Sequence, residues 1–267
     1  MSERIKKIFE TKGKKLVTFT TGGDPDFNTS LEILKTIINN GIDIIEIGMP
    51  FSDPMADGPT IQESSVRSLA NGTKINDIFK IVENIRQFNN EIPIILMGYY
   101  NSIFNLGIDN FTAKCAVTGV DGLIIVDLQP EEDSELLTKT KEKGIDLIRL
   151  ITPTTDQKRL TTILSNASGF LYYVTVTGIT GQNSANIEDL KKSINTIKSS
   201  TKLPIVAGFG IKNKNDVEQI STFTDGVVVG SSIVNIIKDN LNDKNKMINE
   251  IKVFTKDLKE GIKEWIG

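Results

Sequence analysis

The sequence predicts an α/β fold in which eight parallel strands alternate with helices and close into a single (βα)8 TIM barrel. Eight short apolar runs recur along the 267 residues, and segments with helical spacing lie between them. The runs are continuously apolar rather than alternating, as expected for parallel strands that are covered on both faces. The chain length also suits this fold, because one such barrel typically has about 250 residues.

Each element follows from its local pattern. The strands are expected at residues 16–20, 42–47, 92–97, 123–126, 147–151, 170–174, 204–207 and 226–229. Apolar residues at i, i+3 and i+4 predict helices in residues 30–40, 77–88, 131–143 and 187–198. An extra amphipathic helix is expected in residues 1–10, and a helix near residues 244–265 is expected to close the barrel. The chain has no linker rich in Pro, Gly or Ser, which favours one domain over residues 1–267. An open, doubly wound sheet is the alternative.

A short motif of glycine, an apolar residue and aspartate precedes several expected strands. It occurs at residues 41–43, 119–121 and 144–146, with a partial copy at 224–226. Glycine after a helix supplies a left-handed turn, and the aspartate then stands at the lower rim of the barrel, where recurring residues usually serve stability. We therefore expect structural roles for Asp43, Asp121, Asp146 and Asp225.

The composition excludes several kinds of active site. The chain has no histidine, so it lacks Ser-His and Cys-His nucleophilic pairs, imidazole bases and the commonest zinc ligand. Its single cysteine, Cys115, can form neither an intrachain disulfide nor a thiolate metal cage, and we expect it to be an ordinary packing residue of a helix. Acid–base chemistry must therefore come from Asp, Glu, Lys or Tyr, without a metal.

Charge and hydropathy indicate a small ligand and a cytoplasmic protein. The formal charge is −3, and charges of both signs are interspersed, which argues against a nucleic-acid or anionic-membrane partner. No apolar run approaches the roughly 18 residues of a membrane span, and the N-terminus lacks the apolar segment of a signal peptide. A single cysteine also suits the reducing cytosol.

Glu46 is the first candidate for catalysis. It is the only ionisable side chain of residues 44–48, on the same side of the expected strand as Ile42 and Ile44. It should therefore point into the barrel near its top. A buried carboxylate without a partner raises its pKa from about 4.3 toward about 6–7, which suits a general acid–base. The alternative is a carboxylate paired with a neighbouring Lys or Arg.

Asp57 is the second candidate, on the connection of residues 49–60, which leads into a helix expected to begin near Ile61. Prolines and Gly58 stiffen this loop, which is expected to cover the barrel mouth with Asp53 and Asp57. Asp57 lies eleven positions beyond Glu46, so the loop can fold back over the same cavity. A carboxylate in a dry strand and one on a wet loop would form an acid/base pair with separated pKa values. For Asp53, a turn-capping role is the favoured interpretation.

Glycines at the ends of the last three strands predict a phosphate site. They cluster in residues 178–181, 208–210 and 230–232, each where a strand ends and a helix is expected to begin. Backbone N–H groups at helix N-termini bind phosphate without Lys or Arg, and barrels commonly build such a site after strands seven and eight. Ordinary tight turns are the alternative.

Two carboxylates and a phosphate site restrict the reaction. Metal-assisted aldol cleavage requires ligands such as histidine, and Schiff-base cleavage requires a lysine at a strand end; the chain offers neither. If a carbon–carbon bond is cleaved, the substrate must itself accept the electrons while the protein moves protons. Tyr172 either forms a hydrogen bond inside the barrel or fills the core, and core filling is also the expectation for Tyr173.

Residues 46–62, EIGMPFSDPMADGPTIQ, resemble the signature of the tryptophan synthase α subunit. The similarity extends over essentially the whole chain, through residues 20–26, 97–101, 178–181, 208–211 and 230–231, in the order and spacing of that family. The resemblance implies a carbon–carbon lyase of tryptophan biosynthesis. Its reaction would be the retro-aldol cleavage of indole-3-glycerol phosphate to indole and glyceraldehyde 3-phosphate.

The same resemblance implies roles for individual residues. Glu46 would move protons at the indole C3 and the glycerol hydroxyl, and Asp57 would hold the indole N–H. The residues that bind the substrate and its phosphate would be Tyr172, Thr180, Gly181, Gly210, Gly230 and Ser231. The chain itself would need no cofactor. It would pass indole to a β subunit that carries pyridoxal phosphate, in an α2β2 heterotetramer. The surface facing this partner would include Asp53, Pro54 and Asn101.

The chain departs from the family pattern at three positions. Val126 and Gln129 stand where the family often has proline, so the loop after the fourth strand is expected to be less rigid. Val176 stands where some relatives carry arginine, which leaves the closing contacts of its loop undefined. Two other interpretations remain open: a lyase that releases indole without a β subunit, and a non-catalytic subunit that binds a phosphorylated ligand.

Overall fold

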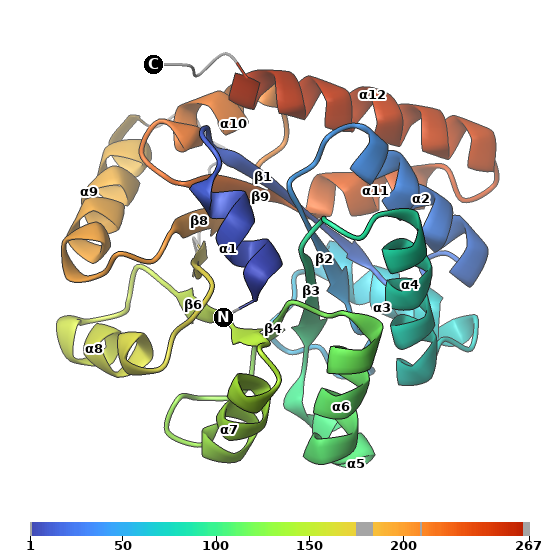
Figure 1. Ribbon diagram of the computed structural model, residues 1–267. Coiled ribbons are helices and arrows are strands. Elements are labelled where there is room, and N and C mark those ends of the chain that lie inside the picture. Colours follow the sequence, from blue (N-terminus) through green and yellow to red (C-terminus); the bar gives the residue numbers. More distant parts are fainter. Residues whose placement is uncertain (1, 175–183, 209, 264–267) are drawn as a thin grey trace.

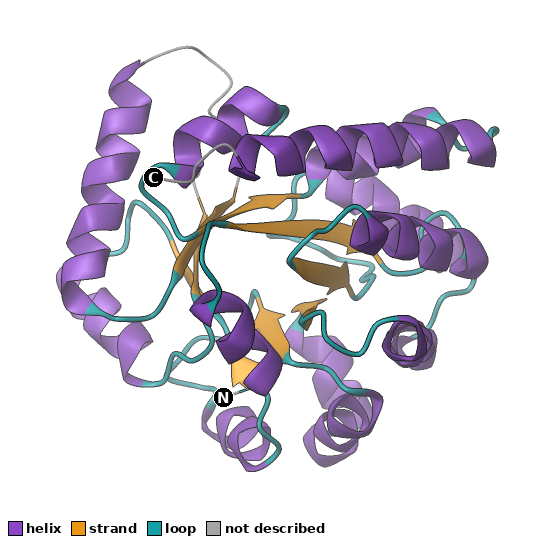
Figure 2. Ribbon diagram, turned by 45° about the horizontal axis from the view of Figure 1, so that its top comes forward, coloured by secondary structure: helices purple, strands orange, loops and turns teal. Residues whose placement is uncertain are grey.

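The computed structural model describes residues 2–174, 184–208 and 210–263. Parallel strands form a nearly closed barrel that helices surround (Figures 1 and 2). The strands are β1 Lys15–Thr21, β2 Ile44–Gly48, β3 Ile94–Gly98, β4 Gly122–Ile125, β5 Asp146–Leu147, β6 Arg149–Ile151, β7 Leu171–Val174, β8 Ile205–Gly208 and β9 Gly226–Val229. Their order around the sheet is β5-β4-β3-β2-β1-β9-β8-β7-β6.

The strands at the two ends of this order are halves of one barrel strand. β5 pairs with β4, and β6 pairs with β7. Only Ile148 lies between them in the chain, and its N–H donates to the carbonyl of Leu123 at 2.9 Å. The fifth expected strand, residues 147–151, therefore closes the ring. The predicted eight-stranded TIM barrel is confirmed, and the open doubly wound alternative is wrong.

The helices lie near their predicted positions. They are α1 Glu3–Glu10, α2 Phe27–Asn39, α3 Pro59–Ala70, α4 Ile75–Phe88, α5 Tyr100–Leu106, α6 Ile108–Thr118, α7 Ser134–Glu142, α8 Gln157–Ser165, α9 Ser184–Ser200, α10 Lys214–Ser221, α11 Ser231–Asp239 and α12 Lys244–Lys263. α2 begins three residues before the expected position, because Asp26 caps it by accepting a hydrogen bond from the Thr29 N–H. Cys115 is fully buried in α6, as expected. Within the described residues, no helix is long and apolar enough to cross a membrane.

Apolar side chains form two layers, one inside the barrel and one between the barrel and the helices. The inner layer takes one buried residue from each barrel strand: Val17, Ile44, Ile95, Ile124, Ile148, Phe170, Val206 and Val228. Neighbouring residues of the same strands join the outer layer. This alternation follows from the pleat of a strand, in which residues i and i+2 share a face.

The two extra helices have different positions. α1 closes the N-terminal end of the barrel, where Ile5 is fully buried in the inner layer and Ile8 and Phe9 pack beside it (Figure 1). The backbone N–H of Ser2 anchors this helix by donating to Asp146 at 2.9 Å. α12 packs against α2, α10 and α11 on the outside. Both predicted extra helices are confirmed, although residues 264 and 265 of the expected C-terminal helix lie outside the described residues.

The recurring aspartates hold the N-terminal rim together. Backbone N–H groups of Leu16, Ile94 and Ile205 donate to Asp43, Asp121 and Asp225 at 2.8, 2.9 and 2.8 Å, respectively. Each carboxylate therefore joins the start of its own strand to a neighbouring strand. Asp146 instead receives the N–H of Ser2. The structural role predicted for these four residues is confirmed.

Asp121→Ala tests this role. Asp121 pairs with Arg86, whose side chain is only 9% exposed and whose pKa burial lowers to about 10. Because the substitution leaves this guanidinium buried without its carboxylate, we expect the free energy of unfolding to fall by about 3–5 kcal/mol. Urea unfolding measures the loss. Asp239→Ala, at an exposed position of α11, should change it by less than about 0.5 kcal/mol, and equal losses would contradict the prediction.

Candidate active site

Glu46 lies inside the barrel toward its C-terminal end. It follows Ile44 by two positions on β2, so its side chain shares the inner face. The side chain is fully buried, and neither carboxylate oxygen has a hydrogen-bond partner in the described part of the chain. Burial raises the pKa of Glu46 from 4.5 to about 8. The predicted direction is confirmed, and the expected alternative of a pair with Lys or Arg is not found among the described residues.

Tyr172 lies close enough to Glu46 for the two groups to interact electrostatically. Burial and the neighbouring Glu46 carboxylate both raise the pKa of the Tyr172 phenol. Its ring packs on the inner layer, and its hydroxyl lies over Gly208, where an added Cβ would come within 2.5 Å of the oxygen. Tyr173 faces the other way and is buried in the outer layer. Tyr172 therefore lies in the barrel interior, where its hydrogen bond stays a prediction, and the core filling expected for Tyr173 is confirmed.

Asp57 lies at the same end of the barrel. It lines a small cavity together with Phe19, and the β1–β2 register places Phe19 beside Glu46. Burial raises the pKa of Asp57, whereas a hydrogen bond with the Tyr99 hydroxyl lowers it. The side chain is half-buried, so this carboxylate is drier than the wet loop position that the sequence predicts. The loop folds inward because Tyr99 holds it there.

Tyr99 is the site residue that sequence reasoning missed. The Ala56 N–H donates to its hydroxyl at 2.9 Å, and the same hydroxyl interacts with the Asp57 carboxylate. Its ring stacks on Phe51 with 5.1 Å between ring centroids. Tyr99 therefore fixes the loop at two points, one on each side of the turn. Its place directly after β3 was the available signal, because residues at the C-terminal ends of barrel strands surround the active site.

Polar contacts hold α3, the helix that follows the Asp57 loop. Arg67 donates two hydrogen bonds of 2.8 Å to the buried carboxylate of Asp24. Further side chains at helical spacing contact residues 21–25: Ser64 with Thr21, Ser68 with the Gly22 carbonyl, and Asn71 with the Pro25 carbonyl. Hydrogen bonds are directional, so they fix the helix along its axis as well as against the barrel. α3 thus positions the loop that carries Asp57.

α3 begins at Pro59, two residues before the expected start. Proline is favoured in the first turn of a helix, where its missing N–H has no intrahelical partner to lose. The early start brings the first residue of the helix to within two positions of Asp57.

The described glycine turns lie at the same end as Glu46. A Cβ on Gly230 would lie 3.2 Å from the Cβ of Phe19, the register neighbour of Glu46. Gly230 precedes α11, and Ser231 begins this helix with an exposed side chain. Gly210 has a φ of +71°, a conformation that favours glycine. The predicted residues Thr180 and Gly181, and the departure at Val176, lie outside the described residues.

The loop after β4 has a side-chain bridge. Arg159 on α8 donates to Gln129 and forms an ion pair with Glu131. These contacts tie the loop to α8 at the position where the family often has proline. Val126, the other departure, lines the cavity that contains Asp57. Whether the loop is less rigid stays a prediction.

The residues predicted to face a partner lie in the segments after β2 and β3. Asp53 and Asn101 are exposed, and Pro54 is half-buried. Asp53 accepts a hydrogen bond of 2.5 Å from the Ser52 hydroxyl within its own turn. The same two segments expose the large apolar side chains of Met55, at 83%, and Phe104, at 69%.

Comparison with known proteins assigns the chain to a family. The family model described as tryptophan synthase alpha chain matches residues 5–263. The chain belongs to the tryptophan synthase alpha chain family. A curated tryptophan synthase alpha chain from Petrotoga mobilis is 43% identical over 256 residues, which cover 96% of this chain and 98% of the relative.

Solved structures agree with this assignment. The crystal structure of tryptophan synthase subunit alpha from Legionella pneumophila matches with a TM-score of 0.91 at 34% identity, over 99% of each chain. A structure of Mycobacterium tuberculosis tryptophan synthase matches with a TM-score of 0.89 at 28% identity, over 98% of this chain and 99% of the other.

Tryptophan synthase alpha chains are carbon–carbon lyases of tryptophan biosynthesis that cleave indole-3-glycerol phosphate, carry no cofactor and work with a β subunit. Family membership gives this chain the same activity.

The pH dependence of stability tests the burial of Glu46. Between pH 5 and pH 8 the unfolded chain ionises Glu46, whereas the folded chain keeps it protonated up to its pKa of about 8. Its contribution to stability is therefore full at low pH and falls as pH rises, by about 1.4 kcal/mol per pH unit. Because Glu46→Gln removes this titration, we expect the variant to gain stability relative to the wild type between pH 5 and pH 8.

Urea unfolding of both proteins at the two pH values measures the gain. Glu142→Gln, at an exposed position of α7, is the matched control and should follow the wild type. If the difference between Glu46→Gln and the wild type were the same at pH 5 and pH 8, Glu46 would not titrate with a raised pKa.

Proposed function

We propose that Glu46 is the general acid–base of indole-3-glycerol phosphate cleavage and that Asp57 holds the indole N–H. The observation that supports this most is the fully buried carboxylate of Glu46, with no hydrogen-bond partner among the described residues and a pKa of about 8. A group whose pKa lies near the working pH both gives and accepts protons efficiently. Its position at the end of the barrel that carries Gly230 and Asp57 supports the same assignment.

The proposed reaction balances around one carboxyl group. Protonated Glu46 gives its proton to the indole C3, which produces an indolenine with a positively charged ring nitrogen. The carboxylate then accepts the proton of the hydroxyl on the adjacent glycerol carbon. The bond between that carbon and C3 breaks, its electron pair restores the indole ring, and the carbon becomes the aldehyde of glyceraldehyde 3-phosphate. Glu46 ends protonated, as it began.

Asp57 stabilises the charge that develops on the indole nitrogen. A carboxylate that accepts a hydrogen bond from this N–H favours the indolenine over the starting indole. Tyr99 keeps the Asp57 carboxylate aimed inward through its hydroxyl. Tyr172, which lies close enough to Glu46 for the carboxylate to raise its pKa, would contact the substrate beside it.

The phosphate group lies, in this proposal, against the N-terminus of α11. The backbone N–H groups at Gly230 and Ser231 have no partners inside the helix and favour a negative charge. Gly210 contributes from the preceding turn. Thr180 and Gly181 are assigned to the same substrate site on the family resemblance alone.

We also propose that this chain passes indole to a β subunit that carries pyridoxal phosphate, in an α2β2 heterotetramer. Asp53, Pro54 and Asn101 would contact this partner. The exposed side chains of Met55 and Phe104 support an interface here, because large exposed apolar residues gathered on one surface are typical of contact sites. The cytoplasmic location and the single domain over residues 1–267 stay predictions of the sequence.

Glu46→Gln tests the catalytic assignment. We expect cleavage, measured as indole release, to fall by about 10²–10⁴-fold, because the amide cannot transfer the proton. Affinity for glyceraldehyde 3-phosphate should stay within about twofold, since phosphate binding uses other residues. The assay is run with and without a β subunit. Equal indole release by the wild type in both cases would indicate a lyase that works without this partner. Unchanged indole release would support the non-catalytic subunit instead.

Gly230→Val tests the phosphate site. A side chain at Gly230 faces Phe19 and crowds the start of α11, so we expect KM for indole-3-glycerol phosphate to rise about tenfold or more. Steady-state kinetics measure the change. The dephosphorylated substrate, indole glycerol, serves as the control because its cleavage does not use the phosphate site. An equal loss with both substrates would show that the substitution damages the barrel and not the phosphate site.

A further inference from the structure

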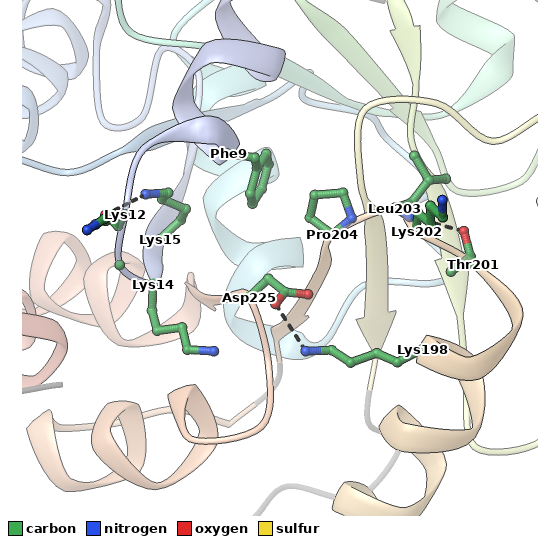
Figure 3. Close-up of a pocket in the computed structure, with 11 residues that line it drawn as sticks. Phe9, Lys12, Lys14, Lys15, Lys198, Thr201, Lys202, Leu203, Pro204 and Asp225 are labelled. Atoms are coloured by element: carbon green, nitrogen blue, oxygen red, sulfur yellow. Dashed lines mark hydrogen bonds and ion pairs between the residues drawn. The ribbon is translucent and has the colours of Figure 1, made fainter. Parts of the chain in front are cut away.

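A second cavity, here called the lower pocket, opens at the N-terminal end of the barrel, away from Glu46 (Figure 3). Its volume is about 950 Å³, at the upper end of the range for small-molecule sites. Three segments surround it: the turn between α1 and β1, the connection from α9 to β8, and the residue that precedes β9. The recurring aspartate before β9, Asp225, therefore lies in its wall.

The lower pocket carries a strong excess of positive charge. Lysine supplies five of its eleven lining residues: Lys12, Lys14, Lys15, Lys198 and Lys202. Asp225 is the one acidic residue among those eleven. Both of its oxygens are occupied, one by the Lys198 ammonium at 3.0 Å and the other by the Ile205 N–H at 2.8 Å. The chain as a whole has a net charge of −3, so this concave surface is opposite in sign to the rest of the protein.

The inner lysines are held in place by the fold. Lys14 donates to the Thr224 carbonyl at 2.6 Å, and Lys15 donates to the Thr11 carbonyl at 2.9 Å. Burial lowers the pKa of Lys14, Asp225 opposes this shift, and the neighbouring Lys198 adds to it. Figure 3 shows the ammonium ends of Lys14 and Lys198 pointing toward one another below Asp225. Two like charges brought together in a partly buried cavity favour a bound anion.

The lower pocket also has an apolar wall. Phe9, Leu203 and Pro204 contribute to it, and Figure 3 shows Phe9 and Pro204 above Asp225, on the side away from the ammonium groups of Lys14 and Lys198. A flat apolar group placed there removes the exposed parts of these rings from water, while its anionic end reaches the lysines. An inorganic anion would contact the lysines alone and leave the apolar residues exposed to water.

We propose that the lower pocket binds a small organic anion that carries at least two negative charges beside a flat apolar group. The site is separate from the proposed active site, because α1 and the inner layer of the barrel lie between the two ends. The proposal does not depend on the roles given to Glu46 and Asp57.

Two probes of similar charge, ADP and pyrophosphate, test the proposal by calorimetry in magnesium-free buffer. Only ADP carries a flat ring, so we expect it to bind more tightly than pyrophosphate. Lys12→Glu/Lys202→Glu should weaken ADP binding about tenfold or more, through reversal of two charges at the mouth. These two side chains are exposed and have no side-chain hydrogen bond or ion pair within the described residues, so their replacement leaves the fold intact.

Lys252→Glu/Lys256→Glu is the matched control. It makes the same charge change on exposed positions of α12 and should leave ADP binding as in the wild type. Indole release should be equal in all three proteins. The proposal is overturned by an absence of ADP binding, by equal weakening in the two double variants, or by ADP binding that the change at Lys12 and Lys202 does not affect. Equal affinity for ADP and pyrophosphate would overturn the role of the apolar wall.

Discussion

The dry interior of the closed barrel is the constraint on which the active site depends. Every barrel strand contributes an apolar residue to the inner layer, and Glu46 is placed among them by the pleat of β2. A carboxyl group in such surroundings keeps its proton, because burial disfavours the charged form and no Lys or Arg of the described residues pairs with it. In the proposed mechanism, Glu46 is therefore suited to acid–base catalysis by desolvation and not by a neighbouring base. A chain without histidine has few other ways to hold an acid–base group near neutral pH.

The surroundings of Asp57 follow a different principle. Its loop and the helix α3 are fixed mainly by hydrogen bonds, through Tyr99 on one side and the contact of Arg67 with Asp24 on the other. α3 buries Ser64 and Ser68 and exposes Val66, the reverse of an ordinary amphipathic helix. Apolar packing tolerates small displacements, whereas a network of directional bonds has one best geometry. The two carboxylates are thus positioned by different forces.

The sequence alone predicted the barrel, both extra helices, the rim aspartates and the orientation of Glu46, because periodicity and the pleat determine these features locally. It did not predict Tyr99, since a tyrosine at a strand end has the same local pattern whether it packs in the core or orders a loop. Nor did it predict that the Asp57 side chain is half-buried, because this burial depends on Tyr99, which lies 42 positions away in the chain. Interactions between distant segments require the three-dimensional arrangement.

The position of α1 determines at which end of the barrel small molecules enter and leave. This helix fills one end of the cylinder with Ile5 and anchors itself to Asp146. The N-terminal end of the barrel is therefore closed, and in the proposed mechanism the substrate reaches Glu46, and both products leave, at the C-terminal end. In the proposed assembly, the exposed segments that carry Asp53 and Asn101 lie beside that opening, so a β subunit bound there stands where indole leaves the barrel.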